Sequence, residues 1–159
     1  MATIDIDIDM SALKKKLKAT EEQIKQGVEN GLRQLASEMK QMEQDIIDDN
    51  DNIGGDGTYK RTGRLKSSIT IMPIRWSNNV AEISVVPKGY GDIPLFNELG
   101  TGIYASNGNG REDGWVYPLG NDEFRFTRGL PPKYFVRDTR AFYEDKAITF
   151  IEKNIQRLL

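Results

Sequence analysis

Hydrophobic and polar residues follow two different periods in the first third of the chain. Residues 3–10 alternate, with isoleucine at positions 4, 6 and 8 and aspartate between them, which predicts a short strand or arm over residues 1–10. From residue 11 to residue 49 the apolar positions recur every three, four or seven residues, which predicts one long amphipathic helix: Leu13, Leu17, Ile24, Val28, Leu32, Leu35, Met39, Met42 and Ile46.

This helix raises two questions that the pattern leaves open. A continuous helix over residues 11–49 measures about 55 Å, so it either projects beyond a domain of this size or breaks. Gly27 and Gly31 lie four residues apart inside it. They indicate either a kink or the close approach of another backbone to that face of the helix, because glycine otherwise costs helix stability.

Residues 50–61 are rich in acid and glycine and predict a solvated loop. A calcium-binding EF-hand loop needs glycine at its sixth and glutamate at its twelfth position. Neither Asp48 nor Asp49 starts a register that meets both conditions. We therefore expect no metal site here.

Residues 62–132 predict a small antiparallel sheet. Ile69 to Met72 and Val80 to Val86 alternate on either side of a turn at residues 77–79, and this pattern is typical of a hairpin that Pro73 interrupts. Residues 103–128 form a long excursion with two short predicted strands around a turn at residues 120–122, and these strands carry four aromatic side chains. These are candidate partner contacts, because aromatic residues anchor interfaces: Trp115, Tyr117, Phe124 and Phe126.

Residues 133–159 return to helical spacing, with Pro131 and Pro132 before the first turn and an apolar stripe that begins at Phe135. No linker divides the chain, so we predict one domain over residues 1–159. The fold class is α+β, in which a small antiparallel sheet of about four strands packs against a long N-terminal helix and a C-terminal helix.

The amino-acid composition limits the kinds of functional site that the chain can form. The chain has 159 residues, 38% hydrophobic and 29% charged, with a net charge of −2 and neither cysteine nor histidine. Disulfides, thiolate chemistry and histidine-based triads or zinc sites are therefore excluded. No run is long and apolar enough to span a bilayer, so we expect no association with a membrane. The N-terminus carries acidic residues where a signal peptide carries basic ones, so we expect the protein to be made in the host cytoplasm.

Two short motifs combine glycine-set bends with one charge and an apolar run. The first is Thr62, Gly63, Arg64 and Leu65, with Thr62 expected to cap a short helical turn; the second contains Glu98, Gly100, Thr101 and Gly102. The simplest interpretation of the glycines is that they permit a positive φ or the close approach of another segment of backbone. Arg64 and Glu98 suggest either an ion pair within the chain or contacts with a neighbouring subunit. No second titrating group lies near Glu98 in sequence, so we expect no catalytic site and no cofactor.

Lys60, Arg61, Arg64 and Lys66 form a local basic cluster. The cluster fits a solvated patch, a contact with an acidic protein surface, or contact with phosphates. The last interpretation makes a nucleic-acid-binding module the alternative function.

The two motifs in this order, followed by Pro131 and Phe135, resemble the HK97 gp10-like family of tailed-phage neck proteins. This resemblance implies a structural virion protein of a phage or prophage-derived tail, with a third strand at residues 97–101. It implies a tail-completion or head-tail connector subunit that forms a ring, hexameric in the particle. Its partners would be further copies, the tail-tube or tail-terminator protein, and the head connector or adaptor, while DNA passes through without sequence readout.

Overall fold

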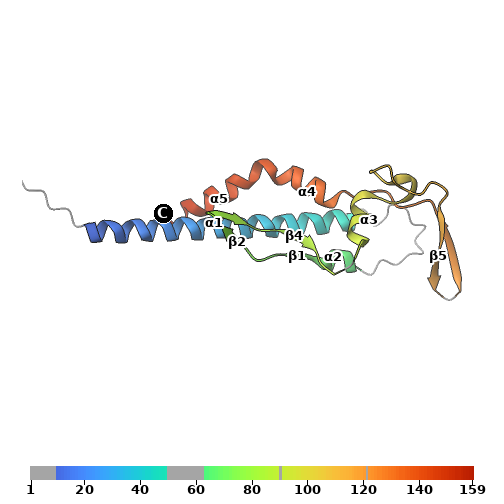
Figure 1. The fold of residues 1–159 in the computed structure, drawn as a ribbon, viewed down its shortest axis with the longest axis horizontal. Helices are drawn as coiled ribbons and strands as arrows, with labels where there is room; N and C mark the ends of the chain where they lie inside the picture. Colours follow the sequence, from blue (N-terminus) through green and yellow to red (C-terminus); the bar gives the residue numbers. More distant parts are fainter. Residues whose placement is uncertain (1–9, 50–62, 90, 121) are drawn as a thin grey trace, which may run out of the picture.

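The computed structural model describes residues 10–49, 63–89, 91–120 and 122–159 of the chain. The predicted arm at residues 1–9, the acidic loop at residues 50–61 and Thr62 lie outside these residues. The fold is α+β, as the sequence predicts: a long N-terminal helix, antiparallel strand pairs and a C-terminal helical segment. Figure 1 shows the long helix as the axis, with C-terminal helices along one side and strands along the other.

Helix α1 (Met10–Asp49) is continuous over 40 residues, or about 60 Å. Of the two alternatives, the helix therefore projects beyond the rest of the domain and does not break. Its first turns extend past the end of α5 (Ala147–Gln156), and the Leu17 side chain there is 62% exposed (Figure 1).

Gly27 and Gly31 mark where α5 lies directly on α1. A β-carbon at Gly27 would stand 2.7 Å from the Ile155 Cα, and one at Gly31 would stand 2.7 Å from the Ile151 Cα. Real β-carbons do not approach backbone this closely. Of the two interpretations of these glycines, close backbone approach is therefore correct.

We predict that Gly31→Ala destabilises the protein by about 2 kcal/mol, because the added methyl group forces α5 away from α1. Helix propensity alone favours alanine by about 1 kcal/mol, so the sign of the change separates the two effects. Urea unfolding provides the measurement, with Ser37→Ala on the exposed face of α1 as the control. A Gly31→Ala variant more stable than the parent would contradict the close approach.

The central strands form one interrupted hairpin. Strand β1 (Ile69–Ile71) pairs with β4 (Val85–Pro87), and β2 (Arg75–Ser77) pairs with β3 (Val80–Glu82). Asn78 and Asn79 form the two-residue turn, both with positive φ, as a type I′ turn requires. The predicted hairpin and its interruption near Pro73 are confirmed. At its tip, Trp76 Nε1 donates a hydrogen bond of 2.9 Å to Glu29 Oε1 on α1.

The core is small and lies where α1, β1 and the start of α4 (Phe135–Tyr143) meet. Its centre consists of Ile47, Ile69 and Phe135, and Phe135 is fully buried. Leu65 of helix α2 (Arg64–Ser68) packs against this cluster. The first motif and the aromatic residue after Pro131 therefore meet in the core.

Two predicted elements differ in the structure. Residues 97–101 form no strand; helix α3 (Ile93–Leu99) occupies that segment, with Pro94 in its first turn and the Asn97 side chain bonded to the Ile93 carbonyl at 2.8 Å. Proline suits a first helical turn and cannot donate to a sheet, which favours the helix.

The C-terminal helix begins at Phe135 rather than at residue 133, and a 3-10 turn, η3 (Glu144–Lys146), divides it into α4 and α5. Tyr134 has a φ of 52° and turns the chain before α4. Lys133 stays outside the helix because its buried Nζ donates to the Ile47 carbonyl at 2.9 Å.

The excursion contains the predicted pair of aromatic strands. Strand β5 (Trp115–Gly120) pairs with β6 (Glu123–Thr127), and the hairpin projects at the end of the molecule opposite the N-terminal turns of α1 (Figure 1). A 3-10 turn, η2 (Gly102–Tyr104), and an irregular segment connect it to α3.

Candidate docking surface

The second motif joins α3 to the start of α4. The Glu98 carboxylate accepts two backbone hydrogen bonds, from Val136 N at 2.9 Å and from Arg137 N at 3.0 Å. These amides belong to the first turn of α4, where the helix leaves N–H groups unpaired and favours negative charge. Glu98 therefore caps α4 from another element.

The predicted ion pair between Arg64 and Glu98 is wrong. Arg64 is exposed on α2, and no ion pair joins it to Glu98 in the part of the chain that the structure describes. The physical reason is that the free amides of α4 satisfy the Glu98 carboxylate. Gly63 adopts the left-handed backbone conformation that the sequence predicts: its φ is 67°, and its carbonyl accepts the Ser67 N–H at 3.0 Å.

We predict that Glu98→Ala lowers the free energy of unfolding by about 2 kcal/mol, because two charge-assisted hydrogen bonds at the start of α4 are lost. Glu112→Ala, a change of an exposed glutamate in the excursion, is the control. Chemical unfolding followed by circular dichroism measures the difference. If the two variants have the same stability, Glu98 does not cap α4.

Gly100, Thr101 and Gly102 form a clamp against the chain just before α4. Thr101 N donates to the Leu130 carbonyl at 2.8 Å, and Thr101 Oγ1 accepts from Leu130 N at 2.9 Å. Gly102 has a φ of 60°, and a β-carbon there would stand 1.9 Å from the Arg128 carbonyl oxygen. The motif is therefore a structural joint that fixes the chain after β6 against the chain after α3.

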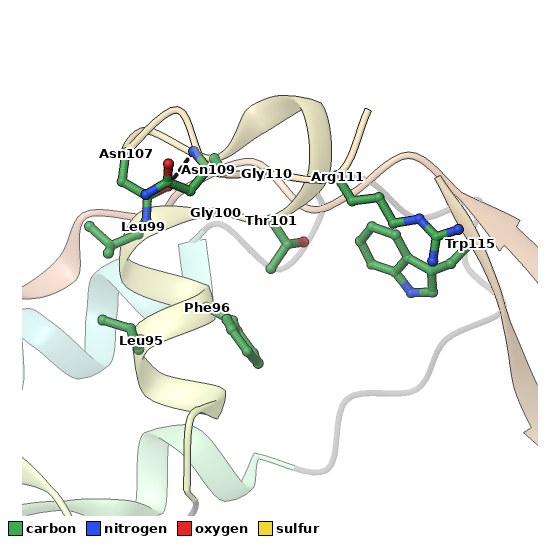
Figure 2. Close-up of a pocket in the computed structure, with 12 residues that line it drawn as sticks. Leu95, Phe96, Leu99, Gly100, Thr101, Asn107, Asn109, Gly110, Arg111 and Trp115 are labelled. Atoms are coloured by element: carbon green, nitrogen blue, oxygen red, sulfur yellow. Dashed lines mark hydrogen bonds between the residues drawn. The ribbon is translucent and has the colours of Figure 1, made fainter. Parts of the chain in front are cut away.

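A groove of about 560 Å³ lies between α3 and the base of the hairpin (Figure 2). Leu95, Phe96 and Leu99 of α3 line it together with Arg111 and Trp115, and Phe96 is on the side of α3 that faces Trp115 (Figure 2). Leu95 is 53% and Phe96 48% exposed. Asn107 and Asn109 stand at its rim. The groove is an apolar hollow with a polar edge, which is the usual form of a protein-binding site.

The hairpin carries a second apolar surface. Cross-strand neighbours share one face of a two-stranded sheet. Val116 pairs with Phe126, and Pro118 pairs with Phe124. Of the four aromatic residues predicted as contacts, Phe124 and Phe126 are exposed on this face, while Trp115 and Tyr117 are half-buried on the other.

The basic cluster is only partly described. Lys60 and Arg61 lie outside the described residues. Lys66 forms an ion pair with Asp48 on α1, and its carbonyl accepts from Gln44 Nε2 at 3.0 Å. Lys66 thus ties α2 to α1, which is a role within the chain that the sequence did not indicate.

Glu43 is a buried acid that the sequence analysis did not single out. It is 2% exposed on the face of α1 that packs against the core, and its Oε2 has no hydrogen-bond partner among the described residues. Burial, with a smaller contribution from the negative charge of Glu98, raises the pKa of Glu43 to about 7. Its burial could have been predicted from its position four residues after Met39, which places it within the apolar stripe of α1.

The described residues hold no group of three or more acidic side chains that could bind a metal ion. Among the helices that the structure describes, none has the length and hydrophobicity to cross a bilayer. No family model, curated protein or solved structure matches this chain. The resemblance to the phage neck family therefore depends on the motif residues themselves.

Proposed function

We propose that this chain is a structural subunit of the neck or tail of a tailed phage, or of a prophage-derived tail. It assembles in the host cytoplasm into a ring, hexameric in the particle, and joins the tail tube to the head connector. The observation that carries this proposal is the pair of motifs, at residues 62–65 and 96–102, in order before the proline and Phe135.

The distribution of apolar side chains supports an assembly role. Among the residues that the structure describes, few hydrophobic side chains are buried: Leu35, Ala36, Ile47, Ile69 and Phe135. Of the sixteen large hydrophobic residues that are exposed in the described chain, eight lie at one end of the molecule, on α3, on η2 and on the β5–β6 hairpin, and the others are spread over α1, β2–β3 and the C-terminal segment. Apolar surface that is exposed and contiguous is typical of an interaction site.

The role of Glu98 supports a structural rather than a catalytic function. A general acid or nucleophile needs a carboxylate that is free to reach a substrate. Both oxygens of Glu98 accept backbone hydrogen bonds from α4. The one acid of the motif thus maintains the joint between α3 and α4.

Deletion of the gene from the phage genome that carries it tests this function. We expect micrographs of the lysate to contain DNA-filled heads and free tails that have not joined, and expression of the intact chain from a plasmid to restore complete particles. A deletion mutant that still produces joined, infectious particles in normal number would contradict the proposal.

A further inference from the structure

The face of the β5–β6 hairpin that carries Phe124 and Phe126 has no partner within the described chain. Val116 is 60%, Phe124 69% and Phe126 58% exposed. An isolated two-stranded hairpin is marginally stable in water, and exposed aromatic residues on one face make it a candidate for burial against another surface. This face is therefore a candidate for binding an apolar surface.

The groove beside α3 is an apolar receptor on the same chain, but its own hairpin cannot fill it. Successive residues of a strand point to opposite faces. Trp115 lines the groove, so the face that carries Val116 points away from it. Only the hairpin of another molecule can place its apolar face over Leu95 and Phe96.

We propose that the apolar face of the β5–β6 hairpin of one copy docks in the α3 groove of the next copy. The two surfaces are different parts of the chain, so the contact is heterologous and repeats from copy to copy until the rotation closes a ring. This inference deepens the proposed function and rests on it, because it names the surfaces by which the subunits join.

The area of the contact is small for a stable interface. A fully exposed phenylalanine can bury about 150–250 Å². Phe124 is 69% and Phe126 58% exposed, and Val116 and Pro118 add less, so the contact buries roughly 800 Å² on both partners together. Stable interfaces bury about 1,200–2,000 Å². The copies therefore associate weakly in free solution and firmly only when many contacts form on a common template.

Cysteine cross-linking tests this contact, because the chain has no cysteine of its own. Asn107 at the groove rim and Glu123 beside Phe124 are exposed, so cysteine at either position leaves the apolar surfaces intact. Full-length Asn107→Cys and Glu123→Cys proteins, with different tags, are mixed at about 500 µM and treated with a short bismaleimide. Glu82→Cys, an exposed glutamate on β3, replaces Glu123→Cys in the matched control.

We expect the mixed pair to yield about tenfold more heterodimer than the Glu82→Cys control or than Glu123→Cys alone. Adding Phe124→Ser and Phe126→Ser to the Glu123→Cys protein should remove this excess, while Val80→Ser, at another exposed apolar position, should not. Circular dichroism verifies that each variant is folded.

Two outcomes would overturn the inference. Preferential linkage of Glu123→Cys to itself would mean that hairpins pair face to face, and a yield equal to the Glu82→Cys control would mean that the groove receives no hairpin. Either result with unjoined heads and tails in the deletion mutant would leave the proposed function standing. Selective cross-linking with normal particles in the deletion mutant would refute the function and retain the contact.

Discussion

Replacement of Gly102 by alanine should destabilise the protein by about 4 kcal/mol, the largest effect that we predict for a single methyl group. The φ of 60° already disfavours any side chain, and the new methyl carbon would stand 1.9 Å from the Arg128 carbonyl oxygen. That oxygen accepts the Ile103 N–H at 3.0 Å, so relief of the clash breaks the clamp. Urea unfolding measures the loss.

Gly108 supplies the matched control for this prediction. Its φ is 71°, but no atom lies within 4 Å of where its β-carbon would be. Gly108→Ala should therefore cost only about 1 kcal/mol, the strain of the left-handed backbone alone. If Gly102→Ala is as mild as Gly108→Ala, the segments around residues 102 and 128 are not clamped as described.

Replacement of Glu43 by glutamine should stabilise the protein by about 3 kcal/mol at pH 8 and change it little at pH 4.5. The pKa of Glu43 is raised from 4.5 to about 7 in the folded chain, so the folded state binds its proton more tightly than the unfolded state does. The resulting stability is fully present below pH 4.5 and is lost as the pH rises through about 7. Glutamine has no charge to bury and removes this pH dependence.

Urea unfolding at a series of pH values gives the result, and Glu22→Gln, at an exposed position on the same helix, is the control. Glu98→Gln provides a second check, because removal of its negative charge should lower the pKa of Glu43 and flatten the same pH profile. A Glu43→Gln variant that keeps the parent's slope between pH 5 and pH 7 would contradict the burial of this charge.

Elements whose partners lie nearby in sequence could be predicted from the sequence. The apolar stripe of residues 11–49 is long enough to specify a helix unambiguously, and Asn78 and Asn79 tolerate the positive φ that the β2–β3 turn requires. The β5–β6 hairpin was predicted for the same reason. The N-terminal arm, Lys60 and Arg61 remain untested predictions, because they lie outside the described residues.

The joint between α3 and α4 could not be predicted, because its partners are far apart in sequence. Glu98 bonds to amides of residues 136 and 137, and nothing local to Glu98 distinguishes this cap from an ion pair with Arg64. Helix α3 has seven residues, too few for helical and strand periods to differ clearly. The groove was missed as a consequence, since it exists only when residues 95, 96 and 99 lie on a helix.

Ring assembly by this chain is the central claim, and the mass of its complex with the tail-tube protein tests it most directly. The intact chain is purified with the tail-tube protein encoded in the same phage genome, and native mass spectrometry counts the copies. We predict a closed assembly of six chains bound to the tail-tube protein, which the Phe124→Ser, Phe126→Ser variant fails to form. A chain that stays single and binds no tail-tube protein would contradict the account.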